Sequence, residues 1–190
     1  MGFQPLWRKA RAGSRADDAR GPWRLSQRAV RNIGLIALGI LAAIAARCAP
    51  VNVQGSVDGR PRLVDGDSFF IGQTEVRMQG IDAPEGRQSC LREGRPWRCG
   101  EDAKRTLQRL MAGAPIRCDI HSKDQHGRGL ATCYAASGEN LNARMVAEGF
   151  AVSFGGYERE EREAKAARRG IWASEFERPQ QWRRRDDGGS

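Results

Sequence analysis

Alternating apolar and polar positions run through the middle of the chain and predict short strands separated by tight turns. β-Branched and aromatic residues recur between turn dipeptides such as Gly72-Gln73, which is typical of half-buried strands. Two further apolar stretches flank residues 123–128 and predict an antiparallel hairpin. We expect strands over residues 60–65, 68–72, 74–81, 116–122, 129–134 and 151–154.

A spacing of three and four residues predicts helices between and after these strands. Ala103, Leu107, Leu110 and Met111 fall on one face of a helix that Gly113 ends. The expected helices cover residues 101–111, 141–148 and 157–169. This order of elements indicates an α+β domain, and about five short strands with three helices fit a small five-stranded OB-type β-barrel.

An uncharged apolar run of 14 residues, Ile33–Ala46, lies near the N-terminus and predicts a hydrophobic helix before the barrel. Eight lysine and arginine residues precede it, as in an export signal. The run is shorter than the roughly 20 residues that span a bilayer comfortably. It is therefore either the core of a signal peptide, cleaved near Ala43-Ile44-Ala45, or an uncleaved inner-membrane anchor. Both alternatives place residues 50–190 outside the cytoplasm, in the periplasm or the medium.

The length of 190 residues fits one compact domain with tails, and we expect it to be a monomer. The predicted organisation is a disordered basic tail (1–32), the apolar segment (33–46), a linker (47–59), the folded domain (60–182) and a frayed tail (183–190).

The net charge of +9 belongs mainly to the N-terminal segment. Residues 1–47 hold nine lysines and arginines and two aspartates, whereas residues 48–190 have an excess of only two positive charges. The global charge is thus weak evidence that the folded domain binds nucleic acid, and the argument must rest on individual residues.

The cysteines predict disulfide bonds. Cys48 follows the apolar run, and the four others are Cys90, Cys99, Cys118 and Cys133. An even number in an exported domain is typical of disulfides, and four cysteines allow three connectivities. We expect Cys90–Cys99 and Cys118–Cys133, the second because a hairpin turning at 123–128 places residue 118 opposite residue 133. A zinc site is disfavoured because no Cys-x-x-Cys spacing occurs.

Three polar clusters at predicted strand ends suggest chemistry. Asp67 and Asp82 offer hard oxygen donors suited to Ca²⁺, and Pro84 stiffens the loop that carries a further carboxylate, Glu85. Arg77 and Arg128 offer guanidinium groups that grip phosphate oxygens. Each cluster alone is typical of a turn, a cap or a surface arginine. Together they favour phosphodiester hydrolysis.

The chain resembles the staphylococcal nuclease-like (thermonuclease) family over residues 60–182. The matching stretches are VDGDS (64–68), VRMQGIDAPE (76–85), CGEDAKRTLQRLM (99–111), DQHGRGLATCY (124–134), ENLNARMVAEGFA (139–151) and GIW (170–172). The resemblance implies an OB-fold barrel and a Ca²⁺-dependent endonuclease acting on DNA and/or RNA. It also implies that Asp67, Asp82 and the carbonyl of Ala83 bind the calcium ion.

The same resemblance implies that Glu85 is the general base and that Arg77 and Arg128 are the catalytic arginines. Two other functions stay open: a non-catalytic nucleic-acid-binding OB module, and an envelope protein that works through its N-terminal segment. The presence of all the carboxylate and arginine side chains favours catalysis over binding alone. His126 stands where the family commonly has an aromatic residue, and the cysteine-bracketed loop 86–98 is expected to shape substrate entry.

Overall fold

The computed structural model describes residues 30–33, 35–40 and 53–187. The chain divides into two compact units, Met1–Pro50 and Val51–Ser190, which are described separately.

In the first unit, the described residues 30–33 and 35–40 are helical. Position 34 and positions 41–46 of the predicted apolar segment lie outside the described residues, so the cleavage site does too. Nowhere in the described part of the chain is a helix both long enough and apolar enough to cross a membrane.

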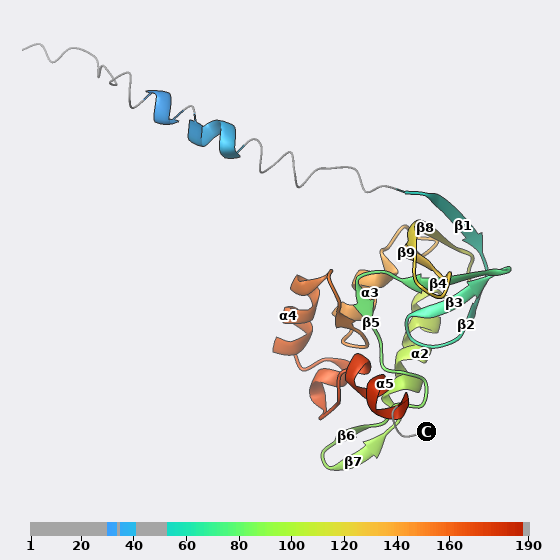
Figure 1. The fold of residues 1–190 in the computed structure, drawn as a ribbon. Coiled ribbons are helices and arrows are strands. Elements are labelled where there is room, and N and C mark those ends of the chain that lie inside the picture. Colours follow the sequence, from blue (N-terminus) through green and yellow to red (C-terminus); the bar gives the residue numbers. More distant parts are fainter. Residues whose placement is uncertain (1–29, 34, 41–52, 188–190) are drawn as a thin grey trace, which may run out of the picture. The chain divides into compact units, whose positions relative to one another are not determined.

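A curled six-stranded sheet forms the body of the second unit (Figure 1). Its strands are β1 (Gly55–Gly59), β2 (Pro61–Leu63), β3 (Ser68–Ile71), β4 (Thr74–Met78), β8 (Ile116–Lys123) and β9 (Gly129–Tyr134). They follow the order β1-β8-β9-β4-β3-β2, and the β4–β9 pair is parallel while its neighbours are antiparallel. The parallel pairing sets the start of β9 beside the middle of β4.

Two small antiparallel pairs and several helices complete this unit. The pairs are β5 (Ile81–Asp82) with β10 (Val152–Ser153), and β6 (Cys90–Arg92) with β7 (Arg95–Trp97). The helices are α2 (Cys99–Leu110), α3 (Leu141–Ala147), α4 (Glu158–Ala166), the 3₁₀ turn η1 (Gly170–Ala173) and α5 (Pro179–Asp187).

The main core lies between the sheet and helices α2 and α3. Alternate residues of β3 and β4 face inward, which buries Phe69, Val76 and Met78, and the apolar face of α2 contributes Leu107. Asn140 begins α3 by accepting a hydrogen bond from the backbone N–H of Ala143 (3.0 Å).

Asn142, on the inner face of α3, is fully buried and ties that helix to the barrel. Its Oδ1 accepts a hydrogen bond from Cys133 N (3.0 Å), and its Nδ2 donates to the carbonyls of Gln79 (2.9 Å) and Ala131 (3.0 Å). One side chain thereby bonds three backbone groups, two of them in buried hydrogen bonds.

A smaller apolar cluster holds the C-terminal part of the chain. Cys90, Cys99, Val152 and Ile171 form its centre, and Trp97, Trp172 and Phe176 pack against it. Leu91 and Glu175 exchange two backbone hydrogen bonds (2.9 and 2.8 Å), so residue 175 extends the β6–β7 hairpin. We call residues 86–98 together with residues 174–187 the C-terminal wall; α5 lies beside the β6–β7 hairpin in Figure 1.

The structure confirms the α+β class, the OB-type barrel and both disulfides, Cys90–Cys99 and Cys118–Cys133. Cys118 lies directly opposite Cys133 in the β8–β9 register, as the hairpin geometry predicted.

Three details differ from the sequence-based predictions. The main sheet has a sixth strand in the described residues, because Gly55–Gly59, expected in a linker, pairs with β8. The loop expected after Asp82 contains the β6–β7 hairpin. The tail expected to fray from residue 183 is helical through Asp187, because Arg183 and Asp186 of α5 form ion pairs with the segment of residues 82–87.

Candidate active site

Two buried aspartates form the floor of the candidate site. The turn before β3 is closed by Asp65, whose Oδ1 accepts hydrogen bonds from Asp67 N (3.1 Å), Ser68 N (2.9 Å) and Ser68 Oγ (2.7 Å). Asp67 in turn accepts a hydrogen bond on Oδ2 from the backbone N–H of Ala83 (2.9 Å). Asp67 and Asp82 are each only 2% exposed. Two carboxylates with little solvent need a cation nearby.

Arg77 supplies part of that positive charge. It lies on β4, and its Nη2 donates to Asp82 Oδ1 (2.8 Å) and lies 3.2 Å from Asp67 Oδ2. One cationic nitrogen therefore contacts an oxygen of each aspartate, so both carboxylates face a common point. Burial raises the pKa of Asp67 well above its ordinary value, and the charge of Arg77 offsets this only in part.

Glu85 lies in the loop after β5 and pairs with an arginine that the sequence analysis did not select. Arg183 of α5 donates from Nη1 to Glu85 Oε1 (2.6 Å) and to Asp82 Oδ1 (2.9 Å). Its Nη2 donates to Asp82 Oδ2 (3.1 Å). Burial opposes the charge of Arg183, but these hydrogen bonds outweigh burial and raise its pKa above the ordinary value.

One sequence signal could have found this helix, though not the contact of Arg183. Proline is favoured at the first position of a helix, and Pro179 begins α5. The contact itself depends on how α5 docks, which local sequence does not encode.

Arg128 lies in the turn between β8 and β9 and lines the same cavity as Arg183. The β4–β9 register places Arg77 opposite Leu130, two residues beyond Arg128. Arg128 donates from Nε to Asp124 Oδ2 (2.7 Å), while the backbone N–H groups of His126 (2.8 Å) and Arg128 (3.0 Å) donate to Asp124 Oδ1. Burial raises the pKa of Asp124, but these hydrogen bonds outweigh it, so the pKa lies below the ordinary value.

Arg77, Glu85 and Arg128 line one open cavity of about 890 Å³, together with Arg183 and His126. Asp67, Asp82 and Ala83, the predicted calcium ligands, are buried and do not line it, but Asp67 contacts Arg77 and Asp82 contacts both Arg77 and Arg183. The six predicted residues therefore gather in one region, while their individual roles stay predictions. Phe154, which is 58% exposed, also lines the cavity.

The donor chemistry of the floor fits a hard divalent cation. Arg77 Nη2 stands where two carboxylate oxygens converge, as they would on a metal ion. Only two carboxylates contribute, and no set of three or more histidine, cysteine, aspartate or glutamate side chains is gathered as a metal site in the described ranges. The other ligands of a bound ion would have to be carbonyl groups and water.

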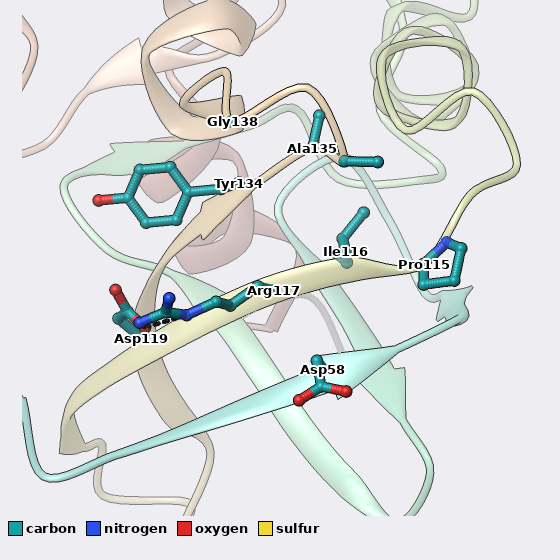
Figure 2. A pocket seen from close by; sticks show the side chains of 9 residues that line it. Asp58, Pro115, Ile116, Arg117, Asp119, Tyr134, Ala135 and Gly138 are labelled. Atoms are coloured by element: carbon teal, nitrogen blue, oxygen red, sulfur yellow. Dashed lines mark hydrogen bonds and ion pairs between the residues drawn. The ribbon is translucent and has the colours of Figure 1, made fainter.

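A second hollow, of about 500 Å³, lies over β1, β8 and the end of β9 (Figure 2). In it Arg117 pairs with Asp119 (2.8 Å), and the ring of Tyr134 stands nearby. None of the six predicted site residues lines this hollow, so we assign the site to the first cavity.

Comparisons with known proteins agree with this geometry. The sequence profile described as "Staphylococcal nuclease homologue" matches residues 75–174. The "Succinoglycan biosynthesis protein ExoI" of Rhizobium meliloti (strain 1021) is 33% identical over 162 residues, which cover 81% of this chain and 82% of that protein.

Two relatives carry nuclease names. The "Probable staphylococcal-like nuclease CAN3" of Oryza sativa subsp. japonica is 33% identical over 125 residues, which are 62% of this chain but only 30% of the rice protein. An "Uncharacterized endonuclease" of Escherichia coli O157:H7 is 28% identical over 122 residues, 59% of this chain and 74% of that protein. The profile match spans more than half of the chain and covers the strands and loops that carry Arg77, Glu85 and Arg128. The chain therefore belongs to the staphylococcal nuclease homologue family.

Proposed function

We propose that this domain is a Ca²⁺-dependent endonuclease that hydrolyses phosphodiester bonds of DNA and/or RNA outside the cytoplasm. The observation that carries the proposal is the meeting of Arg77, Glu85 and Arg128 at one cavity above two buried aspartates. The nuclease names of several relatives support the same reaction class.

Asp67 and Asp82 would hold the calcium ion, with the carbonyl of Ala83 as a further ligand. When bound, Ca²⁺ would supply positive charge that stabilises the developing charge on the phosphate. Hard carboxylate and carbonyl oxygens suit this ion better than they suit a softer metal.

The chain's own residues account for the remaining chemistry. The carboxylate of Glu85, which is partly exposed to the cavity, would take the proton of the attacking water molecule. Arg77 and Arg128 would donate hydrogen bonds to the non-bridging phosphate oxygens, where negative charge grows in the transition state. Arg128 Nε donates a hydrogen bond to Asp124 Oδ2 (2.7 Å), which holds the guanidinium in position. Its terminal nitrogens would then donate to a phosphate.

An extracytoplasmic location is supported by the two disulfides, which persist in oxidising compartments. The basic segment and apolar run before residue 47 would act as an export signal or an anchor.

A test compares hydrolysis of plasmid DNA and of RNA in Ca²⁺ and in a chelator. We expect chelation to abolish cleavage and Glu85→Gln to lower kcat by about 100-fold or more, since a general base typically contributes about 10²–10⁴. Asp119→Asn, a charge removal in the other hollow, serves as the control and should cleave normally. Full activity in the double variant Arg77→Ala/Arg128→Ala would contradict the roles of the two arginines. No cleavage by the wild type in Ca²⁺ would contradict the proposal as a whole and favour a non-catalytic binding module.

A further inference from the structure

Arg183 occupies the carboxylates that the proposed function assigns to metal binding and proton transfer. Its guanidinium faces both oxygens of Asp82 and also contacts Glu85, at N–O distances of 2.6–3.1 Å. Asp82 Oδ1 additionally accepts a hydrogen bond from Arg77 (2.8 Å), so both oxygens of this aspartate are engaged. We propose that Arg183 is a tethered counter-ion that competes with Ca²⁺ for Asp82 and Glu85, so that metal binding requires its displacement.

The distances make simultaneous occupation unfavourable. A calcium ion binds carboxylate oxygens at about 2.3–2.6 Å and needs six to eight ligands around it. Guanidinium nitrogens of Arg183, which itself lines the cavity, already lie 2.9 Å from Asp82 Oδ1 and 3.1 Å from Asp82 Oδ2. One cation must therefore leave before the other can bind both oxygens.

The charges of the cluster point the same way. Three carboxylates, those of Asp67, Asp82 and Glu85, face the guanidinium groups of Arg77 and Arg183. A divalent ion that replaces Arg183 leaves the cluster neutral, whereas one added beside it leaves an excess positive charge at the buried floor.

Contacts between residues 85–88 and the α5 segment hold Arg183 in place. Gln88, which is fully buried, accepts from Glu85 N on Oε1 (3.2 Å) and donates from Nε2 to the carbonyl of Glu177 (2.6 Å), just before α5. Arg87 pairs with Asp186 on α5 (2.5 Å). The same short segment thus anchors both the loop of Glu85 and the helix of Arg183.

This inference rests on the proposed function, because it concerns the same carboxylates. Its consequence is a threshold: the domain would need more free Ca²⁺ to load its site than a domain without this arginine. Released from Asp82, Arg183 would remain on the cavity wall, where phosphate oxygens are its natural partners.

Isothermal titration of Ca²⁺ alone into the full folded protein tests the competition. The variants are Arg183→Ala and Arg183→Gln, with Arg184→Ala as the matched control. No ion pair between Arg184 and a carboxylate is seen among the described residues. Arg184 lines the same cavity and carries the same charge on the same helix. Asp82→Asn shows whether the heat belongs to this site.

We expect both Arg183 variants to bind Ca²⁺ about tenfold or more tightly than wild type, since charged hydrogen bonds that compete with the ion are removed. Arg184→Ala should change the affinity by less than about threefold, because only the general field is altered. Near-UV circular dichroism of each variant verifies that the fold is retained.

Three outcomes overturn the inference: unchanged or weaker Ca²⁺ binding in both Arg183 variants, an equal gain in Arg184→Ala, or no Ca²⁺ binding in any variant. The nuclease assay separates this failure from that of the proposed function. Ca²⁺-dependent cleavage with unchanged affinity removes only the role of Arg183. Tighter binding without cleavage in any variant removes only the endonuclease.

Discussion

The two sides of the cavity are built in different ways. On the barrel side, Asp67 directly precedes β3, Arg77 lies on β4 and Asp82 lies on β5. Ser68 pairs with Arg77 in the β3–β4 register. In the C-terminal wall, Gln88 contacts Glu177 across 89 residues of sequence. Strand pairing and core burial fix the first side, whereas a few long-range contacts and one disulfide fix the second. We therefore expect damage to the C-terminal wall to change the site while the barrel stays folded.

Gly100 is the position where the two sides meet, and Gly100→Ala should have the largest effect. A Cβ atom there would lie 1.7 Å from the carbonyl oxygen of Glu85, so the loop that carries this carboxylate must move. We expect a loss of at least about 3 kcal/mol in the free energy of unfolding, as for severe overpacking. A displacement of about 1 Å at Glu85 would also lower kcat by about 100-fold. Urea unfolding and a nuclease assay measure the two effects.

Gly86→Ala is the matched control for this substitution. Its added Cβ meets open space, and it lies next to the same loop. Stability and activity close to wild type are expected. A large loss in this control would show that the loop rejects any side chain, which would contradict the specific clash at Gly100.

The Cys90–Cys99 disulfide ties the β6–β7 hairpin to the start of α2, and its removal should loosen the C-terminal wall. For nine residues of separation, loop entropy gives about 2.6 kcal/mol of stability for Cys90→Ser/Cys99→Ser. In hydrogen exchange, the amides of Leu91 and Glu175, which bond to each other's carbonyls, should lose protection. Amides of β8 and β9 should keep theirs.

The barrel disulfide provides the comparison. Cys118→Ser/Cys133→Ser removes a bridge across 15 residues and should cost a similar free energy of unfolding, about 3 kcal/mol, while Leu91 keeps its protection relative to global unfolding. If Cys90→Ser/Cys99→Ser left both stability and activity unchanged, residues 86–98 would have no part in shaping the site.

Two fully buried amides, Gln88 and Asn142, compare the two sides at the level of single residues. Each bonds backbone groups of separate segments, so truncation to alanine removes hydrogen bonds of buried and partly buried backbone groups and costs about 2 kcal/mol. Asn142→Ala should lower the stability of the whole barrel. Gln88→Ala should mainly raise hydrogen exchange in α5. Equal exchange profiles for the two variants would contradict the division into two sides.

The features that the sequence predicted lie mostly on the barrel side, and those that it missed lie mostly in the C-terminal wall. The order of elements and the family resemblance predicted the barrel class, and the cysteine count with the hairpin register predicted the disulfides. The gathering of Arg77, Glu85 and Arg128 could be predicted because short motifs at strand ends carry them. The position of Arg183 could not, because three consecutive arginines near a polar C-terminus are typical of a frayed end. Long-range contacts of α5 fix Arg183, the first of the three, and no local pattern encodes those contacts.

Strand β1 was missed for a related reason. Gly55–Gly59 contains two glycines and one charged residue, which weakens any local strand signal. Its order comes from the register with β8, in which Val57 lies opposite Cys118. Pairing with β8 stabilises the extended conformation, for which the sequence of residues 55–59 has little preference of its own.

Substitution of Asp124, in the β8–β9 turn on the barrel side, should have the smallest effect on stability. Its carboxylate accepts from Arg128 Nε and from two backbone N–H groups, and these bonds hold its pKa below the ordinary value of 3.8. A lowered pKa in the folded state means that the stabilisation is present at neutral pH and disappears as the pH falls below 3.8 through the folded value. Asp124→Asn should therefore cost about 1 kcal/mol at pH 7, where the charged hydrogen bonds exist.

The difference between wild type and Asp124→Asn should shrink towards zero in acid, because the wild-type carboxylate is then protonated as well. Urea unfolding from pH 7 down to about pH 2 follows this difference. Activity at pH 7 should fall by only about tenfold, since Arg128 is still present but loses the partner that positions it. Asp119→Asn, whose carboxylate pairs with a largely exposed arginine in the other hollow, should leave activity unchanged. A stability difference that instead grew in acid would mean that Asp124 is destabilising when charged, and the turn would not be what orients Arg128.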